Sequence, residues 1–527
     1  MLLALFTVHF SLSVNHAAAQ ATWNEGFTNS PQNLRYGSKN PTRLAYNHVR
    51  DFAVADINYS LTRGDFHAID ASGDAHDISA YIGGLRHIGR FDVQGHLSYK
   101  NQKDNNQSWN STLWNNNNNP FLLCDSIAGD ATTESYDMGA AAAYTFNDRL
   151  KAALQIGLRT GSRSDQSDPR PRTVTTVLPI TIGADYQLSG SWNIGAAVGY
   201  RLFSSYIEYT YAASTNAVPT RYFLMKGMSD YAKRSSSDER SYKRDYQGND
   251  YSATLSATWQ PTDGPWANML EATYTTGSED ATDGGDSYNF LGGDYDETVL
   301  TASDRLQWRP SRNMLHNLTL TATMTDGKGT WYDQKRELDH ELSGSVIYRM
   351  LGKSINHKTQ RTAATLQYRL DLFDAEGRQD LFAALSGTME SITRKQLLGD
   401  ATPKQEIQTV DLALEVGKAF YMNKVTLLAQ LSGGLRTPQK QTYASGCIYT
   451  DDENIDAVYT RHVFEYETAQ SWRIGATVDA SMPVSDKLTA GIYAKGRYQA
   501  YSGKNDYWQG YDGTHLTTAD FGAYIKF

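Results

Sequence analysis

The stretch HNLTLTATMT at residues 316–325 alternates apolar and polar side chains. Its apolar members are Leu318, Leu320, Ala322 and Met324, and threonines stand between them. Successive side chains of a β-strand point to opposite faces, whereas a helix would repeat about every 3.6 residues. The stretch therefore predicts a strand with one apolar face and one polar face.

The same alternation recurs in WNIGAAVGY (192–200), KVTLLAQLSG (424–433) and WRIGATVDASM (472–482). The composition agrees, because 34 tyrosines and 42 glycines accompany abundant Asn, Thr and Ser in the 527 residues. Tyrosine and threonine are common in strands and less so in helices. We predict an all-β fold.

Short turns and long polar stretches alternate between the expected strands. Tight turns occur at 87–91, 147–149, 189–191, 261–266, 310–313, 374–378, 421–424 and 483–487. The largest polar stretches are 102–133, 213–248, 278–296, 327–359 and 437–467. Outer-membrane barrels have this arrangement, with short periplasmic turns and long extracellular loops. We therefore expect a closed antiparallel transmembrane β-barrel of about 18 strands (16–18), closed because a sheet edge finds no hydrogen-bond partner in hydrocarbon.

The two faces of these strands have different expected roles. An aromatic girdle beside the turns is predicted at Phe146, Tyr186, Trp192, Trp266, Trp308, Phe373, Phe420, Tyr421 and Trp472. The opposite face is expected to line the lumen with charges of both signs: Lys151, Arg159, Glu271, Arg369, Asp371, Asp411, Glu415, Arg473, Asp479, Lys495 and Arg497.

Targeting and charge limit the remaining possibilities. The apolar run MLLALFTVHFSLSV, followed by AAAQA, predicts a signal peptide over 1–20. We expect a periplasmic segment at 21–50 and the barrel at 51–527, with no transmembrane helix. The formal net charge is −9 and no basic stripe occurs, so a nucleic-acid partner is not indicated.

The chain ends in DFGAYIKF, in which Asp520, Gly522, Ile525 and Phe527 follow a recognisable pattern. They resemble the C-terminal signal read by the outer-membrane barrel assembly machinery. The stretch from Val54 to Asn101 is similar to the opening of uncharacterised outer-membrane barrels of the Bacteroidota. This resemblance implies location and architecture, and no catalytic residues. TonB-dependent transporters carry a plug domain of more than a hundred residues before their first strand. The first strand is expected near residue 51 here, so we do not expect this chain by itself to be a plugged transporter of that kind.

Two sets of residues have catalytic residue types. His96 and Ser98 share a strand face, at a spacing that resembles outer-membrane phospholipase. Phe91 and Leu97 occupy the apolar phase, so we expect a hydrogen-bonded pair in the lumen instead. The acidic stretch 451–456 with His462 supplies the residue types of omptin-like proteases, but a solvated acidic loop is favoured. We predict no enzyme.

Three features of the outer loops leave alternatives open. The acidic, glycine-rich stretch 279–297 could hold Ca²⁺ or face surface polysaccharide. The stretch 108–124, with five successive asparagines and two tryptophans, is either flexible or a glycan contact. Cys124 and Cys447 could pair, because the compartment is oxidising.

The expected function is an integral outer-membrane β-barrel, acting as a passive pore or as an accessory channel of a nutrient-uptake assembly. The first alternative is a surface protein that binds a partner or glycan through its loops, and the second is a barrel hydrolase. Expected partners are outer-membrane lipid and the barrel assembly machinery, with a glycan or other outer-membrane uptake proteins as further candidates. No cofactor and no metal site are assigned.

Overall fold

The computed structural model describes residues 31–47, 51–211, 221–235, 241–285, 288–339, 345–397, 402–444, 455–502 and 514–527. The predicted signal peptide lies outside these ranges. The described chain forms an 18-stranded sheet and a separate three-stranded sheet. The all-β prediction is therefore confirmed.

The strands of the large sheet follow one another around it in chain order. They are β1 (Asp51–Gly64), β2 (Asp74–Ile88), β3 (Phe91–Gln107), β5 (Gly129–Thr145), β6 (Leu150–Asp165), β7 (Arg172–Gln187), β8 (Trp192–Thr210), β11 (Ser241–Trp259), β12 (Trp266–Gly284), β13 (Asn289–Ser311), β14 (Met314–Asp339), β15 (Ser345–Phe373), β16 (Gln379–Gln396), β17 (Lys404–Met422), β18 (Val425–Ala444), β19 (Ser471–Ser485), β20 (Leu488–Tyr501) and β21 (His515–Lys526).

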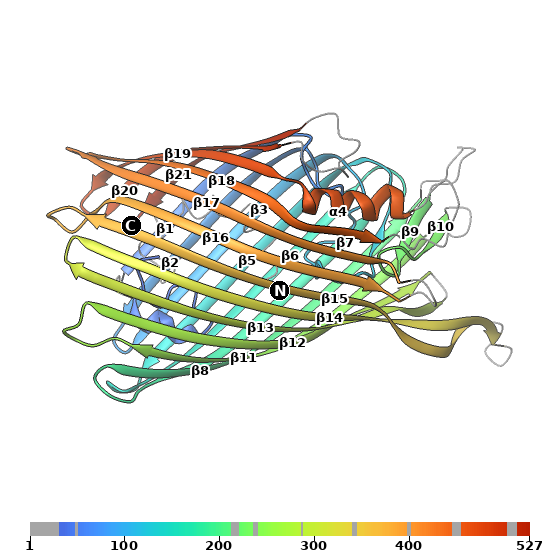
Figure 1. Cartoon of the computed structure of the whole chain (residues 1–527), viewed down its shortest axis with the longest axis horizontal. Coiled ribbons are helices and arrows are strands. Elements are labelled where there is room, and N and C mark those ends of the chain that lie inside the picture. The colour runs from blue at the N-terminus through green and yellow to red at the C-terminus, as the bar shows by residue number, and fades with distance from the viewer. Residues whose placement is uncertain are drawn as a thin grey trace.

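The large sheet closes on itself. Neighbouring strands pair antiparallel, and β1 pairs with both β2 and β21. The closing seam runs from Val54 opposite Lys526 to Gly64 opposite Leu516. The result is the barrel of inclined strands in Figure 1. Closure satisfies the backbone groups that an open edge would leave unpaired in lipid. The predicted closed antiparallel barrel and its count of 18 strands are confirmed.

The strand ends confirm the predicted turns and correct the predicted loops. Eight short turns join strands at one rim, which we take as periplasmic, and β1 begins and β21 ends there. At the other rim, two of the expected long loops are mostly strand. The stretch 278–296 is the end of the β12–β13 hairpin, and 327–359 is the end of the β14–β15 hairpin, which projects beyond the barrel (Figure 1). These strands continue past the lipid, where polar side chains occupy both faces, the few apolar ones no longer alternate with them, and the period of two disappears.

The outer face is apolar where the sequence predicted it. Ile194, Val198, Leu320 and Met324 are exposed on the outside of the barrel. Eight of the nine girdle residues lie near the periplasmic turns, as predicted, and Trp266 stacks on Trp308 with ring centroids 5.3 Å apart. The ninth assignment is wrong, because Trp472 lies at the opposite, extracellular end of β19.

The remaining elements belong to the inserted parts. They are η2 (Pro41–Tyr46), the three-stranded sheet of β4 (Leu123–Cys124), β9 (Arg221–Met225) and β10 (Tyr231–Ser235), the π-helical turn η3 (Asp456–Thr460) and α4 (Arg461–Thr468). No helix in the described ranges is long and apolar enough to cross a membrane. Large fully buried side chains gather at the extracellular end, among them Tyr209, Tyr222, Phe121, Phe223 and Phe464.

Candidate functional site

The interior of the barrel is the candidate site, and its predicted charges are largely paired. Arg473 donates to both carboxylate oxygens of Asp411 at 2.7 and 2.6 Å. Arg369 lies 2.8 Å from Asp371, which is fully buried. These four residues alternate with apolar residues of their strands, of which Tyr368, Leu412, Trp472 and Ile474 are exposed. Such pairing removes most of the net charge from this part of the wall.

Other predicted wall residues contact polar or aromatic side chains of the same wall. Tyr524 donates to Asp479 at 3.0 Å, and Gln430 donates to Glu415. Arg497 donates to Gln499 at 3.2 Å. Lys495 is buried, with its ammonium 5.6 Å from the ring centre of Tyr493. That these residues line a path for solutes stays a prediction.

The last three predicted residues contact chain that has entered the barrel. Glu271 accepts hydrogen bonds from the Ser38 hydroxyl at 2.5 Å and the Lys39 backbone at 2.9 Å. Lys151 lies 3.4 Å from the ring centre of Tyr46. Arg159 stacks over Trp114 at 3.9 Å. The interior is therefore occupied by two inserted parts, one near each rim.

The first inserted part is the N-terminal segment, residues 31–47, which we expected in the periplasm. It lies against the inner wall near the periplasmic rim. Arg35 pairs with Asp185 at 3.0 Å, and both side chains are almost fully buried. Tyr46 also donates to Asp185. Leu44 packs in an apolar cluster with Leu85. Contacts from β2 around to β13 hold the segment across this mouth.

Local sequence explains why the segment turns where it does. Asn40 caps η2, since its side-chain oxygen accepts from the Thr42 backbone at 3.0 Å. Its amide donates to the Ala184 carbonyl of the wall at 3.0 Å. Glycine at 183 makes room, because a Cβ there would lie 2.2 Å from the Asn40 oxygen. The wall is thus shaped to receive this segment.

The second inserted part is the extracellular cap, which we define as residues 108–128, 221–235 and 455–470. Trp109 joins these three pieces, because its ring lies 5.3 Å from that of Phe223 and 5.2 Å from that of Tyr459. Both tryptophans of the asparagine-rich stretch are engaged with protein, here and at Arg159. The structure does not support their prediction as a stacking surface for glycans.

The asparagine run attaches the cap to two wall carboxylates. Glu279 accepts hydrogen bonds from the Asn116 backbone and from the Asn115 and Asn119 amides, each at 3.0 Å. Glu297 accepts from the Asn116 amide at 3.1 Å and the Asn118 amide at 2.8 Å. The run is therefore an ordered contact, and the flexible interpretation is wrong.

Those two glutamates begin and end the acidic stretch that the sequence marked for Ca²⁺ or polysaccharide. Their side chains point inward and are buried. Asp280 and Asp296 are exposed on the outer side of the same hairpin. In the part of the chain that the structure describes, no three His, Cys, Asp or Glu residues are arranged to hold a metal ion.

An apolar anchor holds the cap to the wall at β8 and β11. Tyr222 and Leu224 of β9 pack in a buried cluster with Phe203, Tyr209 and Tyr242 of the wall. β9 pairs on one side with β10 and on the other with β4. This sheet therefore has an apolar attachment, unlike the asparagine run.

The piece containing α4 covers the opposite side of the mouth. Phe464 is fully buried against Ile392 and Ile407 of the wall. Arg394 donates to the carboxylate of Glu467 at 2.6 and 2.8 Å. The cap thus contacts strands all around the extracellular rim.

Arg244 on β11 links the wall to the cap. Its guanidinium donates to both oxygens of Asp283 at 2.6 Å and to the Phe121 carbonyl at 3.1 Å. Tyr246 donates to the same carbonyl at 2.7 Å. Glycine at 293, with φ of +112°, leaves space for the Phe121 ring, since a Cβ there would lie 2.6 Å away.

We expect D283A to lower the thermal unfolding temperature of the purified barrel strongly. The Arg244 and Asp283 side chains are only 0% and 1% exposed. Removing one partner of such a buried pair costs about 3–5 kcal/mol, because the other charge stays buried alone. The double variant R244M/D283L should lose less than D283A, and exposed D326A should behave as wild type. Unfolding of D283A at the wild-type temperature would contradict this assignment.

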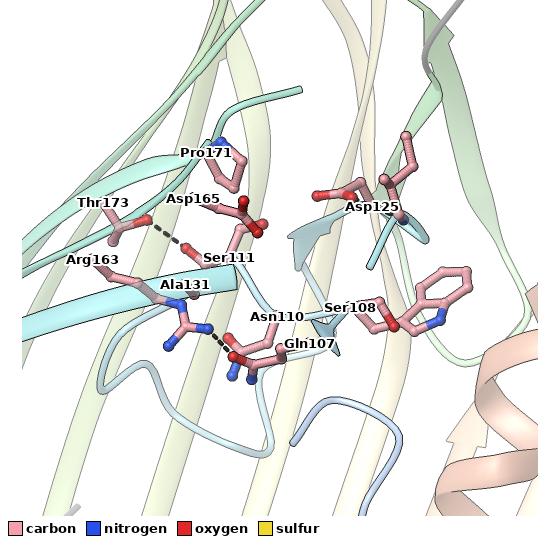
Figure 2. Close-up of a pocket in the computed structure, with 12 residues that line it drawn as sticks. Gln107, Ser108, Asn110, Ser111, Asp125, Ala131, Arg163, Asp165, Pro171 and Thr173 are labelled. Carbon is pink, nitrogen blue, oxygen red and sulfur yellow. Dashed lines mark hydrogen bonds between the residues drawn. The ribbon is translucent and has the colours of Figure 1, made fainter. Parts of the chain in front are cut away.

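A small polar pocket lies at the edge of the cap, between the loop after β3 and the ends of β6 and β7 (Figure 2). Arg163 donates to Gln107 and pairs with Asp104 at 3.0 Å. Thr173 donates to the Ser111 carbonyl at 2.5 Å. Burial raises the pKa of Asp125, which also lines the pocket, to about 7. The pocket offers hydrogen-bonding groups and no catalytic arrangement.

The two catalytic candidates do not form a catalytic arrangement. His96 lies 3.2 Å from Asp137 and is not hydrogen-bonded to Ser98, so the expected pair is absent.

In α4, burial lowers the pKa of His462, and the nearby Arg461 adds to this effect. Most of the acidic stretch 451–456 lies outside the described residues. Cys124 is buried in the cap, and Cys447 also lies outside the described residues, so the expected pairing is not tested.

Fold and surface together define the class of protein. A closed 18-stranded barrel with exposed apolar side chains outside and polar, charged side chains inside is an integral outer-membrane β-barrel. A family model matches residues 41–527, and the chain belongs to that family, described as a family of unknown function (DUF6850). No curated protein matches the sequence significantly.

Solved structures of outer-membrane proteins resemble the chain at low identity. The siderophore receptor PiuA from Acinetobacter baumannii is 9% identical, with a TM-score of 0.41 over 90% of this chain and 82% of that one. The RagAB peptide importer is 8% identical, with a TM-score of 0.41 over 91% and 87%. A Pseudomonas aeruginosa FadL homologue is 12% identical, with a TM-score of 0.35 over 96% and 97%. At these scores the likenesses carry no argument about substrate.

Proposed function

We propose that this protein is a gated channel of the outer membrane for polar solutes, with the extracellular cap as its gate. The wall carries charged and amide side chains, which suit hydrated solutes better than apolar ones. The passive pore expected from the sequence becomes, in this proposal, a pore that is closed in the described conformation. An accessory role in an uptake assembly fits the same barrel.

The observation that carries the proposal is the contrast between two of the attachments of the cap. The contact of β9 with β8 and β11 is apolar and aromatic, so its separation would expose large side chains to water. The contact of the asparagine run with Glu279 and Glu297 is made of hydrogen bonds, which water can replace. The first contact acts as an anchor and the second as a releasable latch.

Planar-bilayer recording of the purified barrel tests the proposal. We expect wild type to remain closed for most of the time and to show brief openings with linear current–voltage relations. The openings should become frequent when the latch is weakened. A barrel that never conducts, even with the latch removed, would overturn the channel.

A second candidate is a surface interaction protein, favoured by the projecting β14–β15 hairpin. Leu338, Met350 and Leu351 on this hairpin are 58%, 54% and 66% exposed. Exposed apolar side chains this far beyond the lipid are suited to contact with another protein. The same recordings separate the candidates, because a barrel that only anchors this hairpin would stay sealed in every variant.

A further inference from the structure

A row of four lysines crosses the outside of the barrel on adjacent strands. Lys328 on β14 lies directly opposite Lys358 on β15. Lys358 lies opposite Lys395 on β16, and Lys395 lies opposite Lys404 on β17. We call these four residues the lysine row. Strands β14 to β17 lie side by side on the near face in Figure 1.

The lysine row faces outward, toward the lipid side of the wall. Lys328 is four residues from Met324 on β14, and Lys395 is six residues from Met389 on β16. Even separations along a strand keep side chains on one face, and both methionines are exposed on the outside. Lys328 and Lys358 are exposed, and Lys395 is partly exposed.

The height of the lysine row matches the lipid head groups. Met324 and Met389 are the exposed large apolar side chains that most closely precede Lys328 and Lys395 on their strands. With about 3.4 Å per residue and a strand tilt near 40°, the lysines lie roughly 10–16 Å beyond those methionines. Long lysine stems can bring the ammonium groups back toward the membrane surface.

The charges around the row do not neutralise its centre. Asp296 lies opposite Lys328 at one end. Glu406 pairs with Lys404 and, at 2.6 Å, with Lys440 at the other end. Among the described residues, no carboxylate lies within 4.0 Å of Lys358 or Lys395. Like charges directly opposite each other destabilise a sheet. A chain with a net charge of −9 nevertheless places lysines side by side here.

We propose that the lysine row binds the phosphate groups of anionic glycolipids in the outer leaflet. Adjacent strands are about 4.8 Å apart, so the row spans roughly 14 Å and can contact more than one phosphate. Lysine binds phosphate as a point charge, and clustered lysines at a membrane surface recognise anionic lipids. The bound phosphates relieve the repulsion within the row. This inference is independent of the channel.

Lipid binding by the purified full-length barrel in non-ionic detergent tests the inference. The probe is lipid A with two phosphates, counted on the barrel by native mass spectrometry. K358Q/K395Q removes the centre of the row, and K424Q/K487Q removes two exposed lysines from periplasmic turns as a matched control. We expect K358Q/K395Q to bind roughly thirty-fold more weakly than wild type, and the control to bind as wild type does.

Three results would overturn the inference. Equal loss in the two variants would show that only total charge matters. If dephosphorylated lipid A bound as tightly as untreated lipid A, the row would not recognise phosphate. If inorganic phosphate displaced lipid A at an equal concentration, the row would be a site for free anions and not for a lipid. Thermal unfolding without lipid should be the same or slightly higher in K358Q/K395Q, since a lipid-free row is repulsive. A lower unfolding temperature would contradict that premise.

Discussion

In planar bilayers, we expect the E279A/E297A variant to be open roughly ten-fold more of the time than wild type. Glu279 accepts three hydrogen bonds from the asparagine run, and Glu297 accepts two. A hydrogen bond to a charged group contributes about 1.5–3 kcal/mol, and about 1.4 kcal/mol corresponds to a factor of ten in population. Burying two carboxylates costs free energy in the closed state, so their removal offsets part of this loss. We therefore expect a change of about ten-fold, which is smaller than five such hydrogen bonds would give alone.

Matched variants make the result specific to the latch. E337A/E376A removes two carboxylates that lie outside the barrel interior, and its recordings should equal those of wild type. E279Q/E297Q keeps an oxygen acceptor at each position, so its open fraction should lie between wild type and E279A/E297A. Recordings in which all four proteins behave alike would show that these hydrogen bonds do not hold the gate.

Release of the N-terminal segment is the second large effect, and D185A should produce it. The Asp185 carboxylate contacts Arg35 and Tyr46, and it is 2% exposed. Without it, the Arg35 guanidinium is left buried without its carboxylate, which favours withdrawal of the segment into water. We expect trypsin to cleave the native protein after Arg35 roughly ten-fold faster than in wild type, because cleavage tracks the population of the released state.

The control for this experiment is D148A, which removes an exposed aspartate from a turn at the same rim. Its cleavage rate should match that of wild type. Combining D185A with E279A/E297A should give longer openings than E279A/E297A alone, since the two inserted parts occupy opposite ends of one path. If Arg35 stays protected from trypsin in D185A, the segment is held mainly by its other contacts, such as those of Glu271 and Leu44.

Strand periodicity was sufficient to predict the barrel. Leu318, Leu320 and Met324 alternate with threonine because one face meets lipid and the other does not. The eight turns were found because that alternation stops abruptly at the periplasmic rim. It failed above the extracellular rim, where residues 327–339 continue as strand with polar side chains on both faces and with no regular alternation of the few apolar ones, such as Trp331 and Leu338. A pattern based on unlike faces gives no signal there.

The interior was only partly predictable. Arg473, Asp411 and Glu271 could be assigned to the inner face by alternation, but their partners could not. Asp185, Glu297 and Arg244 were not singled out for their contacts, because a charge on a strand does not show what chain will approach it. The asparagine run was noticed, yet composition favoured flexibility over the ordered contact that it makes.

Periodicity along the chain was enough to predict a closed membrane barrel. Every second residue of a strand faces lipid and must be apolar, and this alternation is visible between neighbouring positions of the sequence. Only the tertiary structure showed that the barrel is filled from both ends. The contacts that fill it join distant residues, such as Asn115 with Glu279, 164 positions apart, and Arg35 with Asp185, 150 positions apart. A polar segment in water and a polar segment folded into a polar lumen have the same composition, so only the contacts distinguish them.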